Sequence, residues 1–391
     1  MQVLIIWLIL RCLTSLFAGI VSAIRPMMPV ESAIPFLPLT SPVSQWLERV
    51  FLSPWLRWDA VWYQRIVSNG YSAENGTAQF HPLYPWLATP LVKMGLSSTL
   101  SLLIISSLAG MALFFIFNRL LQLDLDKQSS FFGFLLFALS PLSFILFAPY
   151  SESLFLLFTV LCLFWARQKS WWLAGLAGGL AVLTRQQGIF LLLPMAWELR
   201  EDSTRKPSLM VRKWKDWLAL GLIPAGMLIW LGYRAIFLSD IQPNFSTLQS
   251  LIYSFLISPS ATQVVEGQQF IWPWQALYIS LQKLFTNPDL DLWVNLITSF
   301  LFIILLGITW RNMRISYKIY TLVITLISFS FYTGTIHPYM GLPRHLLVAF
   351  PVFIGLAGII KKSWIRLLTI SLSASGMLFL LGLYVLQGWI P

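Results

Sequence analysis

Long apolar runs, separated by short loops rich in lysine and arginine, cover most of this 391-residue chain. A helix needs about 20 apolar residues to cross roughly 30 Å of hydrocarbon. We predict eleven membrane spans, at residues 4–24, 99–121, 131–148, 152–166, 171–184, 187–198, 217–238, 292–310, 317–336, 345–360 and 365–388. The expected fold class is therefore an all-α polytopic membrane protein, with one integral-membrane domain over residues 1–391.

Composition favours the same class. Only 10% of the residues are charged and 57% are hydrophobic, whereas a soluble domain carries about a quarter charged residues to keep its surface wetted. Cys12 and Cys162 both lie inside predicted spans, so neither a disulfide framework nor a zinc site is indicated. Gly175 and Gly179 form a GxxxG pair, which predicts the close approach of two helices.

The positions of the basic residues indicate the orientation of the spans. Sixteen of the 26 lysines and arginines lie in short loops that the positive-inside rule assigns to the cytosol. They are Arg119, Lys127, Arg167, Lys169, Arg200, Arg205, Lys206, Arg212, Lys213, Lys215, Arg311, Arg314, Lys318, Lys361, Lys362 and Arg366. Because the net charge of +11 is spread over these loops, we predict no nucleic-acid partner.

Two long loops, at residues 25–98 and 239–291, are assigned to the non-cytosolic side. The first is expected to carry short interfacial helices, one of them with an apolar stripe. The residues of this stripe are Trp46, Leu47, Val50, Phe51 and Trp55.

Ionisable residues gather at the outer ends of the predicted spans. Each has a plain structural interpretation: Asp59 could cap a helix or pair with Arg57, Glu152 could favour a helix dipole, and Arg185 could reach the interface. His337 and Arg344 could belong to an ordinary wet loop. We favour a functional interpretation because the topology places all of them on one side, near the bilayer surface. The group consists of Asp59, His81, Glu152, Arg185, His337 and Arg344.

The motifs around these residues resemble the PIG-V family of mannosyltransferases. Arg57-Trp58-Asp59-Ala60 with Tyr63 and Gly70-Tyr71, then Phe80-His81-Pro82-Leu83-Tyr84-Pro85, resembles the first outer loop of that family. Pro149-Tyr150-Ser151-Glu152-Ser153-Leu154-Phe155, Thr184-Arg185-Gln186-Gln187-Gly188 and Pro343-Arg344-His345 are similar to its later signatures, in family order. The departure is Gln186-Gln187, where Ser-Asn is more usual, and it leaves the acceptor and the sugar open.

The resemblance implies a GT-C glycosyltransferase, with a GT-C-like bundle of about eleven transmembrane helices and a large first non-cytosolic loop. Such enzymes take a sugar from a polyprenyl-phosphate donor on the non-cytosolic face. Eukaryotic members add the second mannose of the glycosylphosphatidylinositol anchor. The compact loops favour a bacterial relative in the plasma membrane over a protein of the endoplasmic reticulum. The implied partners are the donor, a lipid or glycan acceptor and membrane lipids, while a membrane-protein partner is left open.

The expected chemistry is transfer of a hexose, mannose first, with inversion. Asp59 is predicted to act as general base, and Arg185 or Arg344 to stabilise the leaving phosphate. Glu152 is the second predicted catalytic residue, orienting the substrates together with His81. The other predicted substrate-binding residues are Arg57, Trp58, Tyr84, Gln186, Trp272, Trp274 and His337.

No metal or other cofactor is required by this scheme, although Asp59 and Glu152 could hold a metal. Two alternatives stay open. One is a transporter or flippase of a lipid-linked sugar, and the other is a non-catalytic membrane subunit of a glycosylation complex.

Overall fold

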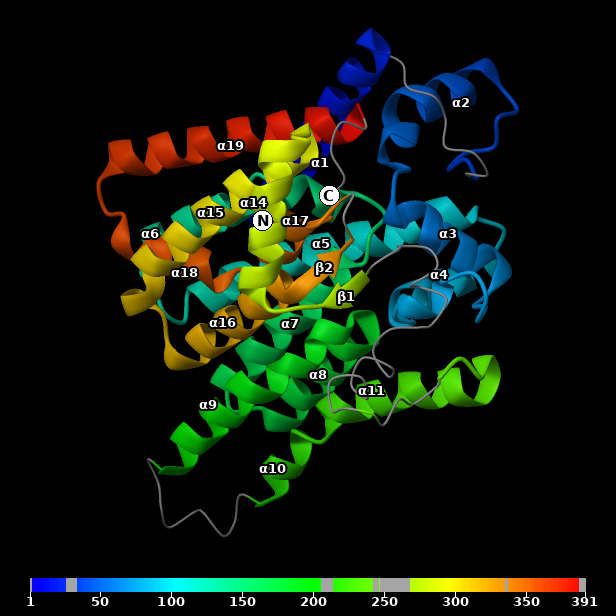
Figure 1. Ribbon diagram of the computed structural model, residues 1–391. Helices are drawn as coiled ribbons and strands as arrows, with labels where there is room; N and C mark the ends of the chain where they lie inside the picture. The colour runs from blue at the N-terminus through cyan, green and yellow to red at the C-terminus, as the bar shows by residue number, and fades with distance from the viewer. Residues whose placement is uncertain are drawn as a thin grey trace.

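The computed structural model describes residues 2–25, 34–204, 214–241, 246, 268–334 and 337–386, and Figure 1 shows that helices dominate this part of the chain. The strands in this part are β1 (Gln268–Phe270) and β2 (Phe331–Thr333), which pair antiparallel with Gln268 opposite Thr333. The all-α prediction is confirmed, with this two-stranded sheet as an addition. Much of the loop 239–291 and the basic residues Arg205, Lys206, Arg212 and Lys213 lie outside the described residues.

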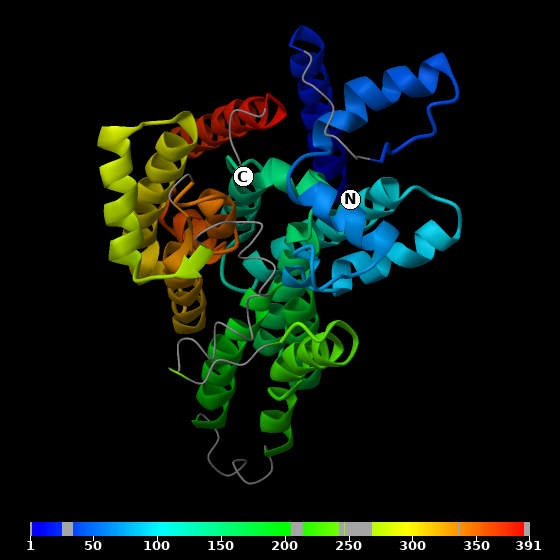
Figure 2. The same cartoon turned by 45° about the vertical axis from the view of Figure 1, so that its right-hand side comes forward.

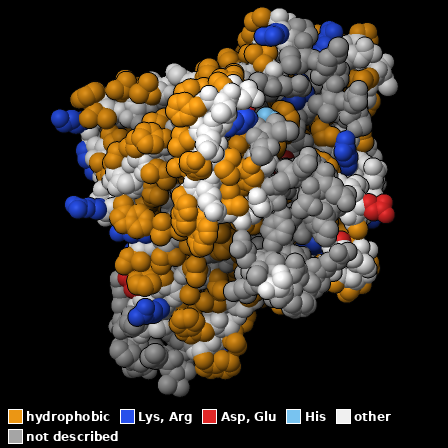
Figure 3. Space-filling view, in the orientation of Figure 1, with side chains coloured by type: hydrophobic (Ala, Val, Ile, Leu, Met, Phe, Trp, Pro, Cys, Tyr) orange, Lys and Arg blue, Asp and Glu red, His pale blue; other side chains and the backbone are white. Residues whose placement is uncertain are grey.

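Five helices of the described part are long and apolar enough to cross a membrane. They are α1 (Gln2–Ile24), α5 (Ser98–Leu121), the stretch Trp214–Leu238, the stretch Leu290–Asn312 and α19 (Ser363–Val385). Two shorter apolar helices are α8 (Trp171–Thr184) and α16 (Ile315–Ser330). In Figure 3, hydrophobic side chains cover much of the described face, and several of the Lys and Arg side chains lie near its margins. The protein is an integral, multi-pass membrane protein.

Several of the predicted spans are interrupted, and two of the breaks lie next to prolines. The segment 131–148 is helical only as α6 (Lys127–Ala138), followed by the 3₁₀ turn η4 (Ser143–Phe147). The segment 345–360 is divided into α17 (Leu342–Leu347) and α18 (Pro351–Ile359). The prediction of an unbroken helix was wrong at both places. Pro141 and Pro351 explain the breaks, because proline lacks an N–H and its ring disfavours helical backbone before it.

A charged side chain from the first helix provides a hydrogen-bond partner for the irregular backbone after α6. Arg11 of α1 donates a hydrogen bond from Nη1 to the carbonyl oxygen of Phe147. The Arg11 guanidinium also lies 5.3 Å from the centre of the Trp55 ring. Irregular backbone within a membrane protein needs such internal partners, since lipid offers none.

The helices of the first long loop lie together, away from the ends of α9 (Leu192–Thr204) and α10 (Trp214–Ala219), in both ribbon views (Figures 1 and 2). They are α2 (Pro42–Leu47), the π-turn η1 (Glu48–Leu52), η2 (Ser53–Trp55), α3 (Asp59–Asn69), η3 (Thr77–Gln79) and α4 (Leu83–Lys93). The predicted apolar stripe holds for Trp46 and Leu47, which are exposed. It is wrong for Trp55, which is fully buried beside Arg11.

The GxxxG pair of α8 packs against the end of α10 and the start of α11 (Leu222–Tyr233), so the predicted close approach of helices is confirmed. A Cβ atom added to Gly179 would lie 2.5 Å from the carbonyl oxygen of Leu222. One added to Gly226 of α11 would lie 2.4 Å from the carbonyl oxygen of Gly179. Only glycine permits backbones to approach this closely. Arg185, which follows α8 directly, is therefore held by a rigid helix pair.

Candidate active site

Four charged side chains meet where separate elements begin or join. Asp59 is the first residue of α3 and Glu152 is the first residue of α7 (Glu152–Arg167). Arg185 joins α8 to the 3₁₀ helix η5 (Gln186–Leu191), and Arg344 lies in α17. The sequence placed Asp59 and Glu152 correctly at helix starts, where a carboxylate favours the positive end of the helix dipole.

Ion pairs connect these four residues in a row, which we call the charged cluster. Arg344 donates from Nη1 to Oδ2 of Asp59 at 2.8 Å, across 285 residues of sequence. Its Nε atom lies 3.1 Å from Oε1 of Glu152. Arg185 donates from Nη1 to that same Oε1 atom. The expectation that distant ionisable residues meet in one place is confirmed for these four.

Exposure differs sharply along the charged cluster. The Glu152 side chain is completely buried, and those of Arg344 and Arg185 are 9% and 14% exposed. The Asp59 side chain is 23% exposed, which makes it the more accessible of the two carboxylates. The two carboxylates and two guanidinium groups balance in charge, as buried ions require. A substrate therefore reaches Asp59 more easily than Glu152.

Two buried polar atoms of the charged cluster lack a hydrogen-bond partner within the described residues. They are Oε2 of Glu152 and Nε of Arg344. The Arg344 Nε atom is close enough to Glu152 for an ion pair but is not aligned for a hydrogen bond. An unsatisfied buried polar group costs about 1–3 kcal/mol. Such atoms are rare, and here they indicate a place where a polar ligand could bind.

The residue before Asp59 has a strained backbone. Trp58 has φ 48° and ψ −117°, a region that residues with a side chain rarely adopt. Such strain costs about 1–3 kcal/mol and persists only where surrounding structure enforces it. The turn lets α3 begin directly at Asp59, with the N–H of Val61 donating to the Trp58 carbonyl at 3.1 Å.

Arg57 does not pair with Asp59, so that structural interpretation of the aspartate is wrong. Its Nη1 atom donates to the carbonyl oxygens of Ser53 and Leu56, both at 3.0 Å. Its own carbonyl oxygen accepts a hydrogen bond of 3.0 Å from the hydroxyl of Tyr150. Arg57 thus fastens the turn that precedes α3, while the partner of Asp59 comes from α17.

Two tyrosines border the charged cluster. The Arg344 guanidinium lies 5.5 Å from the centre of the Tyr150 ring. The Tyr63 hydroxyl donates to Oγ of Ser151 at 2.8 Å and ties α3 to the start of α7. Both tyrosines stand inside the sequence motifs, but sequence reasoning assigned them no role. The available signal was their proximity in sequence, since Tyr63 follows Asp59 by four residues and Tyr150 precedes Glu152 by two.

His81 contacts α8 rather than Asp59. Its Nδ1 atom lies 2.5 Å from the carbonyl oxygen of Val182, three residues before Arg185. Burial, together with the positive charges of Arg234 and Arg185, lowers the pKa of His81 to about 3. The imidazole is therefore neutral and donates from Nδ1.

The remaining predicted residues lie in different surroundings. Tyr84 is fully buried and donates to the carbonyl oxygen of Leu102 at 2.9 Å. Gln186 follows Arg185 directly and is half-buried. Nδ1 of His337 lies 3.3 Å from Oδ2 of Asp291, in α15 (Leu290–Thr309).

Trp272 and Trp274 form an exposed aromatic pair at the start of α14 (Pro273–Thr286). Their rings stack with centres 4.9 Å apart, and each residue is 62% exposed. They are open to lipid or ligand, and no contact between them and the charged cluster is seen among the described residues. Their predicted role in substrate binding stays a prediction.

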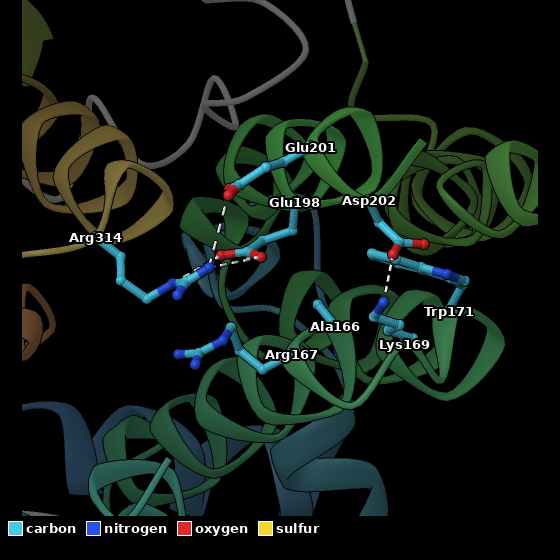
Figure 4. A pocket seen from close by; sticks show the side chains of 8 residues that line it. All are labelled: Ala166, Arg167, Lys169, Trp171, Glu198, Glu201, Asp202 and Arg314. Carbon is cyan, nitrogen blue, oxygen red and sulfur yellow. Dashed lines mark hydrogen bonds and ion pairs between the residues drawn. The ribbon is translucent and has the colours of Figure 1, made fainter. Parts of the chain in front are cut away.

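A hollow of about 190 Å³ lies at the other end of α7, which carries basic residues (Figure 4). Charged side chains line it in opposite pairs, and Figure 4 shows Arg314 paired with Glu198, and Lys169 with Asp202. Its lining residues are Ala166, Arg167, Lys169, Trp171, Glu198, Glu201, Asp202 and Arg314. Arg167 is 15 residues after Glu152 on α7, a rise of about 22 Å. The hollow is therefore separate from the charged cluster.

No group of three or more metal-binding side chains occurs within the described residues. The carboxylates of Asp59 and Glu152, the pair considered for a metal, both contact Arg344. The absence of a metal requirement stays a prediction.

Comparison with known proteins bears on the half of the chain that holds most of the charged cluster. A family model described as Mannosyltransferase (PIG-V) matches residues 2–195, a segment that includes Asp59, Glu152 and Arg185. The resemblance inferred from the motifs is thus confirmed over this segment, and Arg344 lies beyond the PIG-V match. A search of curated proteins finds no match to the chain.

Two solved structures share part of the helical arrangement. ArnT from Cupriavidus metallidurans bound to undecaprenyl phosphate is 13% identical with a TM-score of 0.47, and the match covers 81% of this chain and 58% of that one. The apo state of the same protein is 13% identical with a TM-score of 0.42, covering 83% and 71%. The chain therefore spans less than two thirds of the first of these structures.

Proposed function

We propose that this protein is a membrane-embedded glycosyltransferase that moves a hexose from a polyprenyl-phosphate donor to a lipid or glycan acceptor on the non-cytosolic face. The PIG-V match over residues 2–195 favours mannose as the sugar. One observation carries the proposal: Asp59 and Arg344 pair at 2.8 Å beside Glu152 and Arg185. An accessible carboxylate next to two guanidinium groups suits transfer from a phosphate-linked donor.

The reaction is a displacement at the anomeric carbon with inversion. The acceptor oxygen bonds to that carbon while the bond from the carbon to the phosphate oxygen breaks. The hydroxyl proton passes to Asp59, and the bonding electron pair leaves with the polyprenyl phosphate. Asp59 suits this role because its side chain is partly exposed, whereas that of Glu152 is fully buried.

The two arginines of the charged cluster are assigned to the phosphate. The leaving phosphate gains negative charge as the bond breaks, and guanidinium groups stabilise it with paired N–H donors. Glu152 is assigned to positioning, because its Oε1 atom lies against both Arg185 and Arg344. His81 supports the same segment through its contact with α8, next to Arg185.

The remaining assignments concern contact with the donor and the surroundings of the enzyme. Trp272 and Trp274 are assigned to the sugar or lipid of the donor, since both rings are exposed. The donor is a co-substrate, and no cofactor is assigned. We favour a bacterial plasma membrane as the location.

The test is transfer by the purified protein in detergent, with radiolabelled mannosyl-phosphoryl-polyprenol as donor and extracted membrane lipids as acceptor. Detergent removes any sealed compartment, so that transport alone produces no labelled product. Asp59→Asn is expected to lower transfer at least 100-fold, the lower range of a general base. Transfer by the purified wild-type protein would also exclude the two alternative functions, a transporter and a non-catalytic subunit.

Glu74→Gln is the matched control, because Glu74 is an exposed carboxylate of the same loop, outside the charged cluster. It is expected to keep full activity. Elution volume and thermal stability must be equal for both variants, so that a loss reflects chemistry. A well-folded Asp59→Asn protein that retains one tenth or more of the activity would rule out Asp59 as the base.

A further inference from the structure

Arg344 is shared between the assigned base and the assigned phosphate site. Its Nη1 atom donates to Oδ2 of Asp59, and its Nε atom faces Glu152 without an aligned hydrogen bond. One oxygen of the base, Oδ2, is therefore held by Arg344. An acceptor hydroxyl must come within about 2.6–3.2 Å of a carboxylate oxygen to pass its proton.

Arg344 also has a buried donor that remains unused within the described residues. The Nε atom is shielded from solvent, and the whole side chain is 9% exposed. Glu152 keeps a second partner, Arg185, on its Oε1 atom. Arg344 can therefore turn from the carboxylates to a new anion without leaving Glu152 unpaired. A phosphate oxygen would give the unused N–H a charge-assisted hydrogen bond.

We propose that Arg344 masks Asp59 until a lipid phosphate binds, and that the donor phosphate then draws Arg344 away and frees the base. This inference rests on the proposed function and adds an order to it. The donor binds first, because the acceptor hydroxyl reaches Oδ2 of Asp59 only after Arg344 has left it. The Tyr150 ring, 5.5 Å from the Arg344 guanidinium, supports the side chain in the masked position.

The test measures binding of a polyprenyl monophosphate, with no sugar and no turnover, to the purified full-length protein in lipid nanodiscs. Asp59→Asn removes the carboxylate that competes for Arg344. We expect the dissociation constant to fall 3- to 10-fold relative to wild type. Glu74→Gln is the matched control and is expected to leave the dissociation constant unchanged.

A double-mutant cycle separates this effect from simple repulsion between two negative charges. Removing the charge of Asp59 relieves its repulsion of the phosphate in any background. It frees a guanidinium for the phosphate only in a protein that contains Arg344. In the Arg344→Gln background, Asp59→Asn is therefore expected to change the dissociation constant less than twofold. If the gain is equally large in that background, or if Asp59→Asn alone gives no gain, the masking proposal is wrong.

Arg344→Lys serves as the second background, because it keeps the positive charge should Arg344→Gln fold poorly. Lysine lacks the planar fork and cannot contact both carboxylates in the same manner. The gain from Asp59→Asn is expected to be smaller in this background than in wild type, and an undiminished gain would contradict the proposal. If Asp59→Asn abolishes transfer but does not tighten binding of the polyprenyl monophosphate, only the masking proposal is wrong. If Asp59→Asn tightens binding but retains transfer, the assignment of Asp59 as the base is wrong.

Discussion

Glu152 and Arg167 are the first and last residues of one helix, α7. Glu152 belongs to the charged cluster, while Arg167 lines the hollow of Figure 4 and donates to Asp124 at 2.7 Å. A single rigid rod therefore separates two polar networks by about 22 Å. Changes in the second network should affect stability without affecting the chemistry of the first.

Glu198 tests this separation at the hollow. It accepts a hydrogen bond from Oγ of Ser316 at 2.5 Å and pairs with Arg314, with a side chain only 9% exposed. Glu198→Ala leaves these partners without their acceptor and should destabilise the protein by about 1–3 kcal/mol. Transfer per folded molecule should equal that of wild type. Thermal unfolding in detergent measures the stability, and an assay at low temperature measures transfer per folded molecule. A large loss of transfer per folded molecule would contradict the separation of the two networks.

Gly226 tests the helix contact that holds Arg185. Gly226→Ala places a methyl group 2.4 Å from the carbonyl oxygen of Gly179, so that α8 and α11 must separate. Overpacking of this kind costs about 1–3 kcal/mol. Gly232→Ala, on the same helix, is the control because its added methyl group meets no atom of another element within 4 Å. The midpoint of thermal unfolding should fall for the first variant alone.

Trp58 tests the backbone strain before Asp59. Alanine and glycine both remove the indole ring, but only glycine adopts φ 48° without strain. Trp58→Gly should therefore be more stable than Trp58→Ala by about 1 kcal/mol. Chemical denaturation of the two purified variants gives the comparison. Equal stability, or greater stability of the alanine variant, would show that the turn is relaxed in solution.

His81 predicts a pH dependence of stability. Its pKa is lowered by burial to about 3, compared with about 6.5 in an unfolded chain. The stabilisation from the neutral imidazole is complete above pH 6.5 and decreases as the pH falls towards 3, because the unfolded state binds the proton first. At pH 5 the loss amounts to about 2 kcal/mol.

His81→Gln provides the comparison for this pH dependence, since glutamine cannot bind a proton in this range. The stability of wild type and variant should be measured at pH 7.5 and pH 5.0. The wild type should lose about 2 kcal/mol more than the variant between the two values. An equal loss would mean that His81 is accessible to protons in the folded state.

The helix starts at Asp59 and Glu152 could be predicted from sequence, because the preference of a carboxylate for the first helical turn is local. The breaks near Pro141 and Pro351 could also have been predicted, because proline disfavours helical backbone at the residue before it. The continuous hydrophobic pattern instead predicted unbroken helices. The span over 152–166 was placed within one residue at its end.

The partner of Asp59 could not be predicted in the same manner. Arg57 was the nearer cation in sequence, but its guanidinium turns back to the carbonyls of Ser53 and Leu56. Arg344 reaches Asp59 only because the fold brings two side chains 285 residues apart in sequence together, which no local pattern predicts. The burial of Glu48, which accepts from the N–H groups of Phe36 and Leu37 at 3.0 Å, is non-local for the same reason.

Arg344 is also the last member of the charged cluster to be synthesised. Asp59, Glu152 and Arg185 are all synthesised more than 150 residues before Arg344. Until then Glu152 has one counter-ion, and Asp59 lacks the guanidinium that it contacts in the folded state. The site therefore cannot be assembled before residue 344 is synthesised, and a product that stops before this residue lacks the guanidinium that contacts both carboxylates.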